Sequence, residues 1–439
     1  MFPSLWRRVV VLWRLALALA CLGSASLAGP VRVEFWHIFS DAPRARWMQE
    51  RADAFNRAHP DIQVVPVAHT SYPQVFQALA TAARTGKAPA LVQISEAGTQ
   101  LAVDSMLFRP LPPQVARQFG DYLPAVLRYY TVGGRLYGIP FNTSSPVLYA
   151  NRTLLRRAGL GDAPLPRTLE ELTRTCDALK RARVPARCLT FPVDAWYFEQ
   201  WAAQGGALWV DGQNGRRQRA TQAYLDSEAV ARPLRWLQQM NAAGYYLNPG
   251  KPEDNAGSTQ LFLKGNVAFL LTSSSRIGQV LAGSRQGGFQ VDVGVMPVPQ
   301  GSPRQGLVVG GSSLWIPREI PARTAAAAQA FALDLTGTAN LAAWHRLSGY
   351  DPLRASSVKL LRQQGWLQPG TAHAAAFEQF RATRPTPATS GALFGSFYEV
   401  RAVLHASIDR VLKGADVTGT LRAAKARADQ IIRAYNARF

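Results

Sequence analysis

After its first 28 residues, the 439-residue sequence lacks any long uninterrupted hydrophobic segment. A membrane-spanning helix needs about 20 consecutive apolar residues, so no transmembrane helix is predicted there. The sequence also lacks the Gly-x-Ser-x-Gly, His-Glu-x-x-His, Walker and Gly-x-Gly-x-x-Gly motifs, and its six histidines are scattered. These absences argue against the common hydrolase, metalloprotease and nucleotide-binding classes. We therefore expect a binding protein without a cofactor, not an enzyme.

The first 28 residues have the pattern of a secretory signal peptide. Arg7, Arg8 and Arg14 precede the short apolar run 15–23, and small residues lead to Ala28. We predict cleavage after Ala28 and a periplasmic or other extracytoplasmic location. Lipidation of Cys21 is an alternative, although Ala18-Leu19-Ala20 matches a lipobox poorly.

Cysteine is scarce. The chain has three, and loss of Cys21 with the signal peptide would leave Cys176 and Cys188. An even pair in an oxidising compartment favours a disulfide over two buried thiols, and the bridge would close a short helix-to-strand loop. No histidine or second cysteine pair lies at ligand spacing, so we expect no metal site.

Acidic residues are also few, 28 against 49 basic ones. Loss of Arg7, Arg8 and Arg14 would reduce the net charge from +21 to +18. Only 7 of the 49 basic residues are lysine, the arginines are dispersed, and no nucleic-acid recognition motif is present. We interpret the charge as a composition bias, not as a sign of nucleic-acid binding. A positive potential would still steer an anionic ligand towards the protein.

The N-terminal part alternates between strand and helix patterns. Strands are predicted at 31–36, 62–67 and 91–94, and helices at 44–59 and 72–85. This alternation is typical of an α/β fold with a parallel sheet covered by helices.

Two extended, Pro- and Gly-containing stretches, 137–149 and 295–315, indicate that the chain passes between two lobes. We predict a two-lobe fold of the periplasmic-binding-protein type II class with a hinged cleft. The N-terminal lobe would comprise 29–140 and 311–358, and the C-terminal lobe 145–305 and 359–439. Ligand sites of such folds lie in the cleft, beyond the carboxyl ends of the strands.

Eight segments in sequence order resemble the extracellular solute-binding proteins of the maltose-binding class, especially the members that bind sn-glycerol 3-phosphate. They are Glu34–His37, Ser71–Gln74, Arg84–Pro89, Glu96–Thr99, Pro140–Tyr149, Gly310–Trp315, Trp344–Tyr350 and Ser396–Arg401. No single segment is specific, but together they span most of the chain. The resemblance implies a monomeric receptor that delivers an anionic small molecule to the permease subunits of an ABC importer.

The resemblance also implies a set of ligand-binding residues: Tyr72, Glu96, Ser144, Ser273, Gly311, Tyr350 and Arg401. A guanidinium, two hydroxyls and a backbone amide suit a phosphate, whereas a carboxylate suits glycerol hydroxyls. The two tyrosines would wall the carbon skeleton. Each residue alone would more often be a surface, turn or core-edge residue, so the prediction depends on all seven occurring together.

The sequence departs from the family pattern where the resemblance implies a second tryptophan. Trp196 is kept, but Val193 stands at the other position, which predicts extra room for a glycerophosphodiester such as glycerophosphocholine. Trp196, with Tyr197, could then face a quaternary ammonium. Arg276 is unexpected and would either bind the anion or point to solvent. An oligosaccharide receptor is the alternative, because 11 tryptophans leave sugar stacking open.

Overall fold

The computed structural model describes residues 29–439, so the predicted signal peptide and Cys21 lie outside the described residues. Its first lobe is built on a five-stranded sheet in the order β2-β1-β3-β11-β6. The strands are β1 (Val31–His37), β2 (Ile62–Ala68), β3 (Leu91–Ser95), β6 (Ile139–Ser144) and β11 (Gly310–Trp315).

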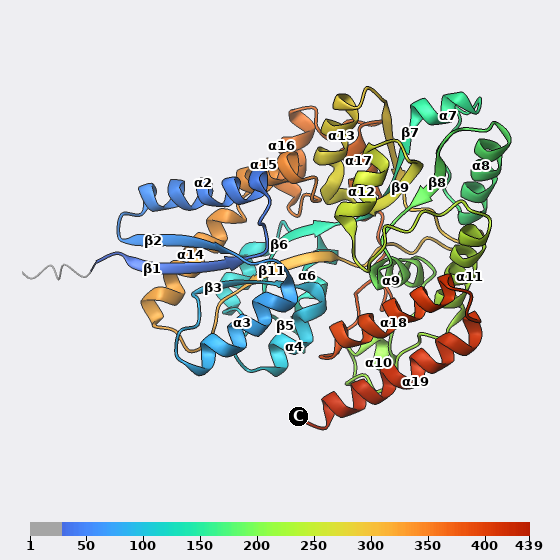
Figure 1. Cartoon of the computed structure of the whole chain (residues 1–439). Helices are drawn as coiled ribbons and strands as arrows, with labels where there is room; N and C mark the ends of the chain where they lie inside the picture. The colour runs from blue at the N-terminus through green and yellow to red at the C-terminus, as the bar shows by residue number, and fades with distance from the viewer. Residues whose placement is uncertain (1–28) are drawn as a thin grey trace, which may run out of the picture.

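Helices flank this sheet, with α2 packing on β2, α14 on β1 and α3 on β3 (Figure 1). The other elements of this lobe are these helices and several shorter segments. They are α2 (Ala42–Ala58), α3 (Tyr72–Arg84), η1 (Glu96–Gly98), α4 (Thr99–Asp104), α5 (Pro113–Ala116), η2 (Arg117–Phe119), α6 (Pro124–Tyr129), β4 (Thr131–Val132), β5 (Arg135–Leu136), α14 (Ala322–Leu335), α15 (Thr338–Ser348) and α16 (Ala355–Gln363).

The second lobe contains a four-stranded sheet in the order β10-β7-β9-β8. Its strands are β7 (Pro146–Asn151), β8 (Arg187–Thr190), β9 (Val267–Ser273) and β10 (Val291–Val295). Its helices are α7 (Arg152–Arg157), α8 (Leu169–Arg181), α9 (Ala195–Gln204), α10 (Asp211–Asn214), α11 (Glu228–Ala242), α12 (Asn255–Leu263), η3 (Ser274–Arg276), α13 (Ile277–Gln286), α17 (Ala372–Arg381), α18 (Phe397–Leu412) and α19 (Val417–Asn436). Figure 1 shows α18 and α19 side by side on this lobe.

Two strand pairs mark where the chain passes between the sheets. β6 belongs to the first sheet and β7 to the second, with only Ser145 between them. β10 belongs to the second sheet and β11 to the first, and residues 296–309 join them. Ser145 donates a hydrogen bond to the buried carboxylate of Asp351 (2.6 Å), and the Asp351 amide donates to Thr143 (2.7 Å). We call residues 143–146 together with Asp351 the crossing segment. The lobe boundaries given above remain a prediction.

The predicted α/β class is confirmed and the three N-terminal strands pair in parallel as expected, but the complete sheet is mixed. β1 pairs in parallel with β2 and β3, whereas β11 is antiparallel to both β3 and β6. In the second sheet only β8 and β9 pair in parallel. Strand periodicity does not report direction, and β11 enters the first sheet from the other lobe instead of from a βαβ unit.

Each lobe has its own hydrophobic core. Phe35, Phe141 and Trp344 are central in the first lobe, and Phe191 and Trp201 in the second, all with at most 2% of their surface exposed. Burial of this apolar surface stabilises the two lobes separately. Within residues 29–439, no helix is long and apolar enough to cross a membrane.

Cys176 and Cys188 are joined in a disulfide that links α8 to β8, with their Cα atoms 5.3 Å apart. The bridge spans 12 positions in the sequence. A loop of that size limits the unfolded chain enough to add about 3 kcal/mol of stability. We expect Cys176→Ser/Cys188→Ser to lower the free energy of unfolding by about this amount.

Denaturant unfolding of the double serine variant, compared with oxidised and reduced wild type, measures this effect. The reduced wild type should unfold at the denaturant concentration of the serine variant. Identical midpoints for the oxidised and serine proteins would contradict the prediction.

Candidate functional site

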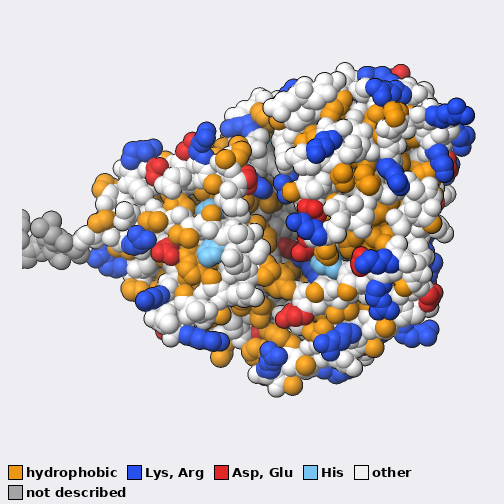
Figure 2. Space-filling view, viewed as in Figure 1, with side chains coloured by type: hydrophobic (Ala, Val, Ile, Leu, Met, Phe, Trp, Pro, Cys, Tyr) orange, Lys and Arg blue, Asp and Glu red, His pale blue; other side chains and the backbone are white. Residues whose placement is uncertain are grey.

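A cavity of about 520 Å³ lies between the two lobes. Figure 2 shows the surface hollowed there, with acidic and histidine side chains visible in the depression. All eight predicted ligand-binding residues line this cavity: Tyr72, Glu96, Ser144, Trp196, Ser273, Gly311, Tyr350 and Arg401. The structure therefore brings together residues that are spread over more than 300 positions of the sequence. Their role in ligand binding remains a prediction.

Tyr72 and Glu96 are positioned by the starts of helical segments in the first lobe. Ser71 caps α3 by accepting a hydrogen bond from the Gln74 amide, and this fixes Tyr72 as the first helical residue. Glu96 follows the carboxyl end of β3 directly and begins η1, for which Ser95 is the cap. Polar residues at the carboxyl ends of strands are where an α/β fold presents its ligand groups.

Ser144 and Ser273 occupy matching positions in the two lobes, because each is the last residue of its strand. Ser273 caps η3 and lies 2.9 Å from the Ser275 hydroxyl. Within residues 29–439, the Ser144 hydroxyl makes only a long contact of 3.5 Å with the Gly310 carbonyl. Its hydrogen-bonding capacity is therefore largely available to a ligand.

Gly310 and Gly311 allow β11 to approach its neighbours closely. A Cβ on Gly310 would lie 2.7 Å from the Trp196 ring. At Gly311 the φ angle is +144°, and a Cβ would overlap the carbonyl oxygen of Asn142. We predicted that the Gly311 amide faces a ligand, but here it donates to Glu96 at 3.1 Å. A ligand that uses this amide must take the place of that carboxylate oxygen.

Arg401 forms a buried ion triad with two carboxylates. Its Nε and Nη2 atoms donate to Glu199 on α9, both at 2.8 Å, and Nη2 also donates to Glu96 at 3.0 Å. The side chains of Arg401, Glu96 and Glu199 are 12%, 7% and 7% exposed. Within residues 29–439, Arg401 Nη1 makes no hydrogen bond, so this nitrogen is the donor left for a ligand.

The triad carries one positive and two negative charges in a region of low dielectric. Burial opposes the charge of Arg401, but the attraction of Glu199 and Glu96 outweighs it and raises the Arg401 pKa. Burial also raises the pKa of Glu96, because the guanidinium shared with Glu199 compensates its charge incompletely. The triad therefore fixes Arg401 as a cation and leaves the Glu96 side of the cavity negative.

Arg276 lines the cavity from the second lobe, next to the hydroxyls of Ser273 and Ser275. Burial and the charge of Arg44 lower its pKa, although a guanidinium stays protonated in proteins. Its one side-chain hydrogen bond within residues 29–439 goes to Gln279, at 3.1 Å. Arg44, by contrast, is paired with Asp41 at 2.6 Å. Arg276 is thus a cavity cation without a carboxylate partner in the described chain.

Trp196 lies on the cavity wall, but the predicted surroundings of this tryptophan are wrong in two respects. Val193 is 3% exposed and packs in the core of the second lobe, so its small side chain does not enlarge the cavity. Tyr197 is fully buried in the same core and cannot face a ligand. Consecutive residues at the start of α9 point in different directions. Neighbouring positions in the sequence therefore do not predict which side chains face the cavity.

Sequence reasoning missed four titratable residues at or behind the cavity: Asp194, Glu199, Glu253 and His405. For two of them, helical spacing from a predicted site residue was a usable sequence signal. Glu199 lies three positions after Trp196 and His405 four positions after Arg401, so each shares a helical face with a predicted site residue. Asp194 and Glu253 precede helices and look like ordinary caps in the sequence.

Residues 50–373 match the family described as bacterial extracellular solute-binding protein, which covers most of the chain. The chain belongs to this family. The resemblance to extracellular solute-binding proteins is therefore confirmed, and the function of this family member is that of a receptor for a solute outside the cytoplasm.

Similar proteins span the chain almost completely. The sn-glycerol-3-phosphate-binding periplasmic protein UgpB of Salmonella typhimurium is 28% identical over 433 residues, or 96% of each chain. A crystal structure of UgpB from Mycobacterium tuberculosis in complex with glycerophosphocholine has a TM-score of 0.76 and 21% identity, and it covers 92% of this chain and 99% of the other. The sugar-binding protein MalE from Xanthomonas citri has a TM-score of 0.72 and 20% identity over 92% and 97% of the two chains. These structures confirm the two-lobe periplasmic-binding-protein fold.

Proposed function

We propose that this family member is the substrate-binding component of an ABC importer and captures glycerol 3-phosphate or a glycerophosphodiester. The observation that carries the proposal is the meeting of all eight predicted residues around one cavity between two lobes. The relatives named above support the ligand class. The protein would be exported by its N-terminal signal, act as a monomer and deliver its ligand to the permease subunits.

The free hydrogen-bonding groups of the cavity suit a phosphate ester. Arg401 Nη1 and the hydroxyls of Ser144 and Ser273 would donate to phosphate oxygens, with charge assistance from the guanidinium. Glu96 would accept from the glycerol hydroxyls, because a carboxylate offers acceptors only. Closure of the two lobes around the ligand would complete this set of contacts.

Arg276 would supply a second positive charge to the phosphate. The Arg401 triad has a net negative charge, so its overall charge opposes the approach of an anion. Arg276 has no carboxylate partner in residues 29–439 and lies beside Ser273 and Ser275. Together these groups form the donor-rich side of the cavity.

Ligand-induced stabilisation tests the proposed function. At about 100 times its dissociation constant, a bound solute adds about 2.7 kcal/mol to the free energy of unfolding. We expect glycerol 3-phosphate or glycerophosphocholine to raise the melting temperature, and maltose and trehalose to leave it unchanged. Thermal unfolding with each of the four compounds, followed by calorimetry on those that stabilise, measures this.

Stabilisation by maltose or trehalose alone would instead favour the oligosaccharide receptor. The cavity contains Trp196, Tyr72 and Tyr350, which are side chains that could stack on sugar rings. Incubation of the protein with glycerophosphocholine should yield no free choline, whereas released choline would indicate a hydrolase.

A further inference from the structure

Charge is distributed unevenly around the cavity. Arg276 lies near Tyr350 and close enough to Arg44 for that positive charge to lower its pKa. Asp194 and Glu253 lie instead near Arg401 and Glu199, on another side of the cavity. That side has four carboxylates, including Glu96, and Arg401 is its one permanently charged cation among the described residues. Arg401, one of the proposed phosphate donors, thus borders an acidic region that suits a cation.

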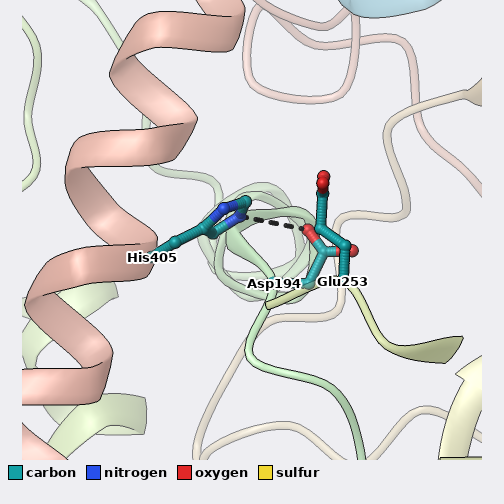
Figure 3. A group of neighbouring side chains, drawn as sticks. All are labelled: Asp194, Glu253 and His405. Carbon is teal, nitrogen blue, oxygen red and sulfur yellow. Dashed lines mark ion pairs between the residues drawn. The ribbon is translucent and has the colours of Figure 1, made fainter. Parts of the chain in front are cut away.

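On the acidic side, Asp194, Glu253 and His405 converge from three separate parts of the second lobe. Figure 3 shows His405 projecting from α18 towards the carboxylates of the other two residues. One oxygen or nitrogen atom of each lies within 4.8 Å of the others. His405 Nε2 lies 3.6 Å from Asp194 Oδ1, too far for a good hydrogen bond. We call these three residues the amine subsite.

The contacts within the protein do not satisfy these groups. His405 is 8% exposed, and its Nε2 atom has no hydrogen-bond partner within residues 29–439. Asp194 uses one oxygen to cap α9, accepting from the Trp196 amide at 2.9 Å. Glu253 is exposed to the open cavity, and its carboxylate makes no hydrogen bond within the described chain, so both oxygens are open to a ligand. Desolvation together with repulsion from Asp194 raises its pKa. A bound cation would relieve this repulsion and occupy the free acceptors.

We infer that the amine subsite binds the primary ammonium group of a glycerophosphodiester whose second alcohol is an amino alcohol. The inference rests on the proposed function. An ammonium has three N–H donors for the three acceptors, with a neutral imidazole accepting at Nε2. Acceptors about 2.9 Å from a tetrahedral nitrogen lie about 4.7 Å apart, inside the 4.8 Å limit of the cluster. The His405–Asp194 pair is closer, at 3.6 Å, a distance near the roughly 3.4 Å between ligands of a zinc ion, so the test below includes metal ions.

The position of His405 relative to Arg401 fits the length of such a ligand. The two side chains are one helical turn apart on α18, and one turn rises about 5.4 Å. An ethanolamine group attached to a phosphate at Arg401 Nη1 can span this distance. Trp196 lines the cavity beside Asp194 and offers its ring to the methylene groups. A quaternary ammonium has no N–H donor and would leave the three acceptors unbonded.

Calorimetry at pH 8 with glycerophosphoethanolamine, its N-acetyl derivative, glycerophosphocholine and glycerol 3-phosphate tests the inference. We expect the wild type to bind glycerophosphoethanolamine at least about tenfold more tightly than the N-acetyl derivative, because a charged hydrogen-bonding group is lost on acetylation. Glu253→Gln and His405→Gln should each reduce this preference severalfold. Glu399→Gln removes an exposed carboxylate from the same helix as His405 without touching the cavity, and should retain the preference.

Three results would overturn the inference. Equal affinities for the amine and its acetyl derivative, with glycerol 3-phosphate still bound, would reject the amine subsite and leave the proposed function standing. Absence of binding for all four phosphates would reject both. Saturable binding of Zn²⁺, Mn²⁺ or Ca²⁺ to chelator-treated protein that is lost in His405→Gln would identify the cluster as a metal site.

Discussion

Arg401→Ala is expected to lower ligand affinity about 10- to 150-fold, because it removes a charge-assisted hydrogen bond to the phosphate. It should also reduce the free energy of unfolding by about 3–5 kcal/mol, because Glu96 and Glu199 lose their shared cation while remaining buried. Calorimetric titration and denaturant unfolding of the same variant measure the two effects.

A second substitution separates binding from folding. Glu199→Gln in the Arg401→Ala background removes one unpaired charge, so stability should recover in part while affinity stays low. Arg410→Ala, an exposed arginine on the same helix, is the matched control and should change neither quantity. If affinity recovers together with stability, Arg401 supports the site without contacting the ligand.

Asp351→Asn is expected to make the protein more stable above pH 7 and to flatten its pH dependence. Burial raises the pKa of Asp351 to about 7, and the hydrogen bond from Ser145 opposes this only partly. The unfolded carboxyl has a pKa of about 3.9, so between about pH 4 and 7 the folded state retains a proton that the unfolded state releases. Stability therefore falls as pH rises through this window, by up to roughly 4 kcal/mol. Asparagine keeps the shape and removes the ionisation.

Denaturant unfolding of both proteins at pH 5 and pH 8 measures this difference. The advantage of the asparagine variant should be larger at pH 8 than at pH 5. Asp53→Asn, which alters an exposed residue on α2, should follow the wild-type profile. Parallel profiles for wild type and Asp351→Asn would mean that Asp351 does not titrate in this range.

Many of the strands and helices could be predicted because they depend on local patterns of apolar and polar residues. The N-terminal strands and helices agree with prediction to within two residues at each end. The antiparallel direction of β11 could not be predicted, because alternation of apolar residues is the same in both directions. Strand direction depends on the route of the chain between the lobes.

The cavity residues were predictable only through the resemblance. Taken singly, Ser144 or Arg401 has no pattern that separates a ligand contact from a turn or surface residue. The amine subsite was not predicted, because Asp194, Glu253 and His405 are far apart in sequence and meet only after the second lobe has folded. The interpretation of Val193 failed for a related reason, since alignment cannot say which way a side chain points.

The two adjacent glycines of β11 limit how the specificity of this receptor can be altered. Any side chain at Gly310 would collide with Trp196, and any at Gly311 would collide with the backbone of Asn142. Neither position can therefore acquire a new functional group for a different solute. A redesign, whether by natural drift or in the laboratory, must work through second-lobe residues such as Arg276, Glu253 and His405, which lie outside the strands.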